Sequence, residues 1–190
     1  MQWNNHYRLR DTHAFLSASQ WHWLRDDKEK LIKRYKSFLA VKEGDKLHKL
    51  AKALIDARIC VADNKHTFGM YVNDSIRLGM DAEVLLYYSD NCYGTADSIL
   101  YLPGLLEIHD LKTGRIPAHM EQLKIYAALF CLEYHVDPEN LEIRLRIYQH
   151  SKIISEDPDP SEIKAIMDKI VDSDEIIDEL KNENLIKEGA

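Results

Sequence analysis

Two β-rich runs joined by a Pro-Gly pair constrain the fold of this chain more than any other feature. The segment YGTADSILYLPGLLEIHDLK occupies residues 93–112. Proline followed by glycine suits the two central positions of a tight turn, and the flanking residues favour extended backbone. We therefore expect an antiparallel hairpin in which Leu102 pairs with Leu105.

That register assigns a face to three charged side chains. Counting outward from the turn, Asp97 lies opposite Asp110, with Cβ atoms roughly 5 Å apart. Lys112 lies two residues beyond Asp110, so strand alternation returns it to the same face. Like charges facing each other across a hairpin are unfavourable unless something compensates them. The sequence thus predicts two acids and one amine converging, with a positive group beside the acids.

Metal-assisted phosphodiester hydrolysis is the chemistry that suits these three residues. Carboxylates are the usual protein ligands of Mg²⁺, which keeps several waters and binds substrate phosphate. Asp97 and Asp110 are the expected metal ligands, with the Leu111 backbone carbonyl as a further candidate. The metal would polarise the phosphate and lower the pKa of an attacking water, while Lys112 orients that water or stabilises developing negative charge.

The rest of the chain predicts helices around these strands. Apolar residues at helical spacing occur before them, with an interruption at Glu43-Gly44, and again after them. The expected helices are 13–40, 45–58, 119–134 and 161–171, and the other strands are 82–89 and 141–149. Residues 60–80 are expected to form a loop with at most one helical turn. The core order is therefore helix, three strands, helix, strand, which predicts an α/β fold with a mixed sheet flanked by helices.

Charge is distributed unevenly along the chain. The net charge is −7, which is unlike the basic surplus typical of nucleic-acid binders. Residues 156–190 hold twelve Asp or Glu against four Lys, a charge of −8, which leaves +1 for residues 1–155. We expect a catalytic domain over 1–155, including the N-terminal helices, and an acidic C-terminal helix and tail over 156–190. A roughly neutral body is compatible with a local basic groove.

The cysteines and the N-terminus exclude several protein classes. Cys60, Cys92 and Cys131 are widely separated and odd in number, so we expect buried thiols rather than a disulfide framework, a zinc site or an iron–sulfur cluster. The first residues lack the apolar run of a signal peptide, and no stretch approaches the length of a membrane span. A cytoplasmic protein without membrane contact is expected.

The pattern of Asp97 followed by Asp110-Leu111-Lys112 resembles the PD-(D/E)XK nuclease superfamily, whose core is likewise helix, three strands, helix, strand. Gln122 and Tyr126 are similar to a motif of its RecB-like and phage exonuclease branches. The resemblance implies that these two residues help to position the lysine and the nucleic-acid backbone. GDKLHKLAKALI looks like a helix of the RecB-like branch, which implies that His48 is a metal ligand or its neighbour.

Two departures from the superfamily pattern are visible. Ala96 replaces the proline before the first acid, and the cysteines of the iron–sulfur members are absent, so no cluster is expected. The resemblance implies an Mg²⁺- or Mn²⁺-dependent deoxyribonuclease, an exonuclease in phage-type DNA processing or recombination. Its partners would be DNA, a second copy of the chain in a homo-oligomer, or a recombination protein.

Several candidates have open alternatives. Glu83 points away from Asp97 if the turn between Ser89 and Cys92 has two loop residues, and towards it if the loop has three. Arg115 could contact a phosphate or be an ordinary exposed arginine. His48 could simply pack against the core, and the Gln122 and Tyr126 pair could be the margin of an amphipathic helix. Glu107 and His109 fall on the opposite strand face and are expected to be structural.

Two other functions remain open from the sequence. One is a catalytically weak accessory protein with a nuclease-like fold that binds nucleic acid or a protein. The other is a purely structural α/β domain in which the acids and the lysine occur together by chance.

Overall fold

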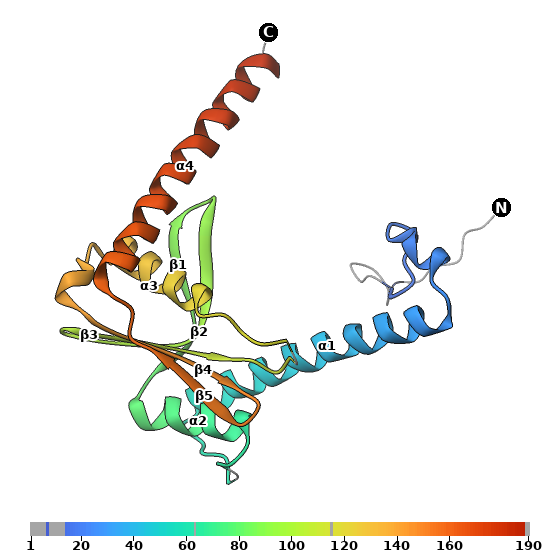
Figure 1. Ribbon diagram of the computed structural model, residues 1–190, viewed down its shortest axis with the longest axis horizontal. Helices are drawn as coiled ribbons and strands as arrows, with labels where there is room; N and C mark the ends of the chain where they lie inside the picture. The colour runs from blue at the N-terminus through green and yellow to red at the C-terminus, as the bar shows by residue number, and fades with distance from the viewer. Residues whose placement is uncertain (1–6, 8–13, 63, 115, 189–190) are drawn as a thin grey trace. The chain divides into compact units, whose positions relative to one another are not determined.

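The structure is a computed structural model that describes residues 7, 14–62, 64–114 and 116–188, with side chains described as far as residue 183 (Figure 1). The chain forms two compact units, Met1–Asp45 and Lys46–Ala190. Every described residue singled out for the site lies in the second unit, and Arg115 lies outside the described residues.

The first unit contains a short 3-10 helix, η2, over Trp21–Arg25, followed by the start of helix α1, Lys28–Asp56. Phe15 packs against Tyr35 and Phe38, with ring centroids 5.1 and 5.2 Å apart. The expected helix over 13–40 is wrong at its beginning. The Asp27 side chain accepts a hydrogen bond from the Lys30 amide at 2.8 Å, which is the capping that starts a helix at this point.

Helix α1 is continuous, so the expected interruption at Glu43-Gly44 is also wrong. One glycine inside a helix costs only about 1 kcal/mol relative to alanine. Lysine, leucine and alanine, which favour helix, surround this glycine. The end of α1 belongs to the second unit, where Ala51 and Ile55 are buried.

Helix α2, Thr67–Leu78, replaces the loop expected over 60–80. Asn73 and Asp74 in its middle are weak helix formers, but tertiary packing overrides that preference. Tyr71 and Val72 are buried, and the Asn73 side chain both donates to and accepts from the Val61 backbone. Gly79 ends the helix in the left-handed conformation, with φ of 76°.

A five-stranded mixed sheet forms the centre of the second unit, in the order β1-β2-β3-β4-β5. All neighbours are antiparallel except β3 and β4, which are parallel and joined by helix α3, Glu121–Tyr134. The expected α/β class and the expected order of three strands, helix and strand are confirmed. The strands are β1 Asp81–Ser89, β2 Cys92–Leu102, β3 Leu105–Leu111, β4 Glu142–Gln149 and β5 Lys152–Glu156.

Two C-terminal features differ from expectation. Strand β5 was not expected, because its turn needs left-handed backbone at His150 and Ser151, with φ of 51° and 56°, where glycine or asparagine is usual. Helix α4 covers Pro160–Glu188, so the segment expected as a helix over 161–171 and an acidic tail is one long helix. Ile163 and Ile170 of α4 are buried in the core on the α3 side.

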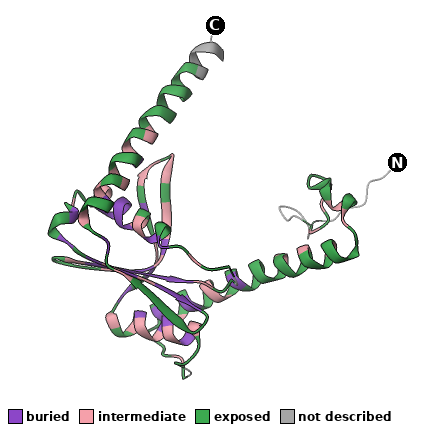
Figure 2. Ribbon diagram, in the orientation of Figure 1, coloured by how far each residue is buried: buried purple, intermediate pink, exposed green. Residues whose placement is uncertain are grey.

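Strand β3 is buried on both faces, and this places its polar residues inside the molecule (Figure 2). Ile108 belongs to the core cluster that contains Leu123 of α3. Leu111 belongs to the cluster on the other face, with Tyr71 of α2. Polar side chains on β3 therefore need partners within the protein.

Two further findings concern the cysteines and the membrane. Cys131 is buried and Cys92 half-buried, but Cys60 is exposed, so the expectation of three buried thiols is wrong for Cys60. Among the described residues, each helix is too short or too polar to pass through a lipid bilayer.

Candidate functional site

The site lies where strand β2 separates from β3. Their backbone pairs run from Leu102↔Leu105 to Ser98↔His109, which confirms the register expected from the Pro-Gly turn. Asp97 is the next residue along β2. Beyond Ser98, the contact between the two strands is made by a side chain and not by backbone pairing: the Leu111 amide of β3 donates to Asp97 Oδ2 at 2.8 Å.

Glu83 reaches the site through a bulge in β1. The turn after Ser89 has two loop residues, which by itself would direct Glu83 away from Asp97. A register irregularity between Tyr87 and Ser89 adds one residue on the β1 side, and from Tyr87↔Tyr93 onward the pairing is shifted by one. Glu83 therefore lies opposite Asp97, as a three-residue loop would have placed it.

The backbone of Glu83 is unusual, with φ of 54°. This left-handed conformation is rare for a residue that is not glycine and carries a cost of order 1–3 kcal/mol. It occurs inside a strand, between the regular pairs Ala82↔Ser98 and Val84↔Ala96. The strand thus departs from regular geometry at the residue that faces Asp97.

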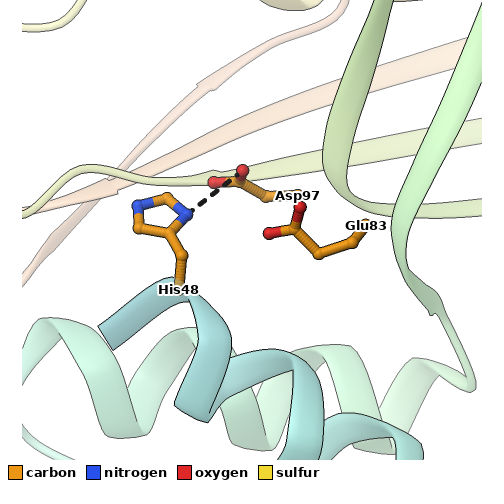
Figure 3. A group of neighbouring side chains, drawn as sticks. All are labelled: His48, Glu83 and Asp97. Atoms are coloured by element: carbon orange, nitrogen blue, oxygen red, sulfur yellow. Dashed lines mark ion pairs between the residues drawn. The ribbon is translucent and has the colours of Figure 1, made fainter. Parts of the chain in front are cut away.

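His48 on α1 completes a group of three potential metal ligands (Figure 3). Its Nδ1 lies 3.3 Å from Asp97 Oδ1. One ligand atom each from His48, Glu83 and Asp97 lies within 4.8 Å of the other two. Two carboxylates and one imidazole are a donor set that suits a divalent cation such as Mn²⁺ or Mg²⁺.

A second group, built on Lys112, adjoins the first through the backbone of Leu111. Lys112 Nζ donates to Asp110 Oδ1 at 2.9 Å and to Gln122 Oε1 at 2.8 Å. Gln122 Nε2 in turn donates to the Tyr126 hydroxyl at 2.9 Å. Gln122 and Tyr126 are four residues apart on one face of α3, as their spacing predicts.

Asp110 is the most buried carboxylate of the site, with 2% of its surface exposed. Burial and then the charge of Asp97 raise the pKa of Asp110, despite the opposing effect of Lys112. Its Oδ2 atom is buried and has no hydrogen-bond partner among the described atoms. An orphaned carboxylate oxygen that feels the charge of Asp97 is a position that a cation would satisfy.

The other two ligand groups are also perturbed by their surroundings. Burial and the neighbouring charge of Asp97 raise the pKa of Glu83. Contact with Asp97 raises the pKa of His48, although burial opposes this. The two acids and the imidazole therefore interact electrostatically as one group.

The structure brings together seven of the residues expected at the site, and the backbone of Leu111 lies beside them. The three metal candidates sit within 4.8 Å, whereas Asp110 lies outside that group and pairs with Lys112. Glu107 and His109 are buried on the opposite face and bonded to each other at 2.8 Å.

One residue beside the site was not expected. Gly94 of β2 lies against Tyr126: a Cβ atom built on it would be 2.9 Å from Tyr126 Cε1. The signal available in the sequence was an isolated glycine inside a β-rich run, which often marks a close approach to the backbone. The sequence alone does not indicate what approaches.

No protein-family model matches the chain, and neither the curated proteins nor the solved structures include a match.

Proposed function

We propose that this protein is a divalent-metal-dependent nuclease that hydrolyses DNA phosphodiester bonds. One observation carries the proposal: ligand atoms of His48, Glu83 and Asp97 lie within 4.8 Å of one another, beside an amine held by Asp110. A purely structural domain has no need for three acids and a histidine together at the point where two strands separate. Like charges placed so close destabilise the fold unless something binds them.

His48, Glu83 and Asp97 would hold the metal. Asp110, whose Oδ2 has no hydrogen-bond partner among the described atoms, would be a further ligand. A bound Mg²⁺ or Mn²⁺ supplies polarisation of the scissile phosphate and activation of water for attack. No iron–sulfur cluster enters the proposal, and the Leu111 carbonyl stays a candidate ligand.

Lys112 would act on the substrate itself. Two acceptors, Asp110 Oδ1 and Gln122 Oε1, fix its ammonium group, and 29% of its side chain remains exposed. An ammonium group so oriented can position the attacking water and stabilise negative charge on the phosphate. Its two acceptors are within the protein, so the lysine is oriented before substrate arrives.

The finer parts of the proposal rest on the resemblance to RecB-like and phage exonucleases. On that resemblance we propose that the enzyme is an exonuclease and that it acts in phage-type DNA processing or recombination. We also propose that it works in the cytoplasm of a bacterial or phage-infected cell. Association with a second copy of the chain or with a recombination protein is proposed from the same resemblance.

The test combines calorimetry with a degradation assay. We expect Mn²⁺ to bind the wild type and to bind Asp97→Ala far more weakly. Linear DNA should be degraded with Mn²⁺ but not with chelator, and closed-circular DNA should persist if the enzyme is an exonuclease. Lys112→Ala should lose degradation, while Lys152→Ala, which removes a lysine of the exposed strand β5, should keep it.

Each outcome discriminates. Equal degradation by Lys112→Ala and wild type would show that a contaminant is responsible and would refute the proposal. Metal uptake without degradation would favour an accessory protein that binds nucleic acid. Absence of metal uptake would refute the proposal and leave a structural domain or an accessory protein that binds its partner without metal.

A further inference from the structure

Gly94 lacks a side chain at a position where one would not fit. It is half-buried in β2, opposite Leu86. A Cβ atom there would lie 2.9 Å from Tyr126 Cε1, 3.7 Å from Cδ1 and 3.9 Å from Cζ. The shortest of these is closer than ordinary carbon–carbon contact, which begins at about 3.5 Å.

Backbone conformation does not explain the glycine. The glycines with positive φ among the described residues are Gly79 and Gly104, and Gly94 is not one of them. Glycine inside a strand weakens it, because its unfolded backbone is freer and it has no side chain to pack. The close approach of the Tyr126 ring is what requires glycine here.

The Tyr126 ring is the first member of a chain of contacts that ends at the proposed catalytic amine. Its hydroxyl accepts from Gln122 Nε2 at 2.9 Å, and Gln122 Oε1 accepts from Lys112 Nζ at 2.8 Å. Gln122 itself is exposed, so packing does not fix its amide. The tyrosine hydroxyl is therefore what directs the amide oxygen towards the lysine.

We infer that Gly94 is a positioning residue for Lys112: it leaves the space in which Tyr126 sits, and Tyr126 orients Gln122 and the lysine through it. The catalytic part of this inference rests on the proposed function. The structural part stands without it, because the contacts from Gly94 to Lys112 can be measured directly.

The test is Gly94→Ala, with Gly114→Ala as matched control, since a Cβ atom on Gly114 meets nothing within 4 Å. The first readout is the side-chain amide resonance pair of Gln122 in ¹⁵N NMR, which we expect to shift in Gly94→Ala and not in the control. The second is kinetic. Misplacement of a catalytic group by about 1 Å can cost a hundredfold, so we expect kcat to fall about ten- to hundredfold, with KM within about twofold of wild type.

A double variant separates positioning from general packing. Tyr126→Leu removes the ring atoms that the new Cβ would meet, so adding Gly94→Ala to it should cause no further loss of kcat. If Gly94→Ala alone prevents folding, the same double variant should fold again. Losses that multiply in the double variant, or unfolding that persists in it, would overturn the inference.

The same measurements test the positioning role of Gly94 separately from the proposed nuclease function. An inactive wild type whose Gln122 resonances still shift in Gly94→Ala would refute the nuclease proposal and retain the positioning role. An active wild type with unchanged Gln122 resonances and unchanged kcat in Gly94→Ala would refute the positioning role alone.

Discussion

Two buried carboxylates on strand β3, three residues apart, have opposite environments. Glu107 is 1% exposed and Asp110 is 2% exposed. His109 Nε2 donates to Glu107 Oε1 at 2.8 Å, and Arg146 lies 3.2 Å from the same oxygen. Asp110 has Lys112 on one oxygen and no described partner on the other.

The pKa shifts express the same difference. Burial raises the pKa of Glu107, but the hydrogen bond from His109 and the neighbouring positive groups outweigh it, so its pKa is lowered overall. Burial and Asp97 raise the pKa of Asp110. The charge of Glu107 is compensated by groups of the protein, as expected for a structural carboxylate. The charge of Asp110 is compensated only in part, as expected for a carboxylate beside a metal site.

The largest expected effect comes from removing the charge of Asp110. We predict that Asp110→Asn lowers DNA hydrolysis on the order of 10³-fold while the fold keeps or gains stability, by about 1 kcal/mol. Lys112 loses its charged partner, but a buried charge that Lys112 compensates only in part also disappears. Hydrolysis assays and chemical denaturation of the same preparation measure both. A variant that is both active and less stable would contradict the assignment of Asp110 to function.

A bound cation should supply the charge that the site lacks. We predict that Mn²⁺ at a hundred times its dissociation constant stabilises the wild type by about 2.7 kcal/mol, seen as a rise in Tm. Asp97→Ala should lose most of this rise. Asp90→Ala, which alters an acid at the hairpin tip, is the control and should keep it. An equal rise in all three proteins would indicate binding elsewhere.

Glu107 should behave in the opposite way to Asp110. We predict that Glu107→Gln lowers the free energy of unfolding by about 2 kcal/mol, because it removes the buried negative charge that accepts from His109 and pairs with Arg146. Mn²⁺ affinity should stay within about twofold of wild type, because Glu107 lies on the opposite face of β3 from Asp110, and His48, Glu83 and Asp97 are on other elements. Denaturation and calorimetry test the two halves separately. Loss of metal binding at wild-type stability would reverse the roles of the two carboxylates.

The smallest effect is a difference in pH dependence. Glu107 has a folded pKa below its ordinary value of 4.5, so its contribution is present above pH 4.5 and is lost as pH falls towards the folded pKa. Asp110 has a folded pKa above its ordinary 3.8, so its ionisation costs stability as pH rises through that range.

Relative to metal-free wild type, Glu107→Gln should therefore be less stable and Asp110→Asn more stable at pH 7. Both differences, of about 1 kcal/mol or more, should shrink as the pH is lowered from 7: the Asp110 difference is lost as the pH falls below 3.8, and the Glu107 difference is lost as the pH falls through the folded pKa of Glu107. Urea denaturation across this range measures them. Differences of the same sign would show that the two environments are not opposed.

Local patterns were enough to predict the centre of the fold. The Pro-Gly turn determined the β2–β3 register, and that register carried Asp97, Asp110 and Lys112 to one region. The spacing of Gln122 and Tyr126 on α3 followed from helix geometry. Each of these relations spans few residues or a single turn.

The other features of the fold and of the site depend on tertiary contacts, which cannot be inferred from local sequence patterns. Glu83 reached the site because of a bulge near Tyr88, although the loop has the two residues that argued against it. Helix α2 forms because Tyr71 and Val72 are buried, against the preference of its polar middle. The role of Gly94 depends on a ring that comes from a different element.

Because of its bulge, strand β1 should tolerate the loss of one residue better than the gain of one. The strand already holds one residue more than a regular hairpin would use, so deletion of Tyr88 can be absorbed by straightening, with Glu83 still opposite Asp97. A residue added in the same stretch could not be absorbed in this way, and it would turn the Glu83 side chain away from Asp97. Deletion of Tyr88 should therefore preserve Mn²⁺ uptake in calorimetry, and insertion of a residue beside it should abolish that uptake.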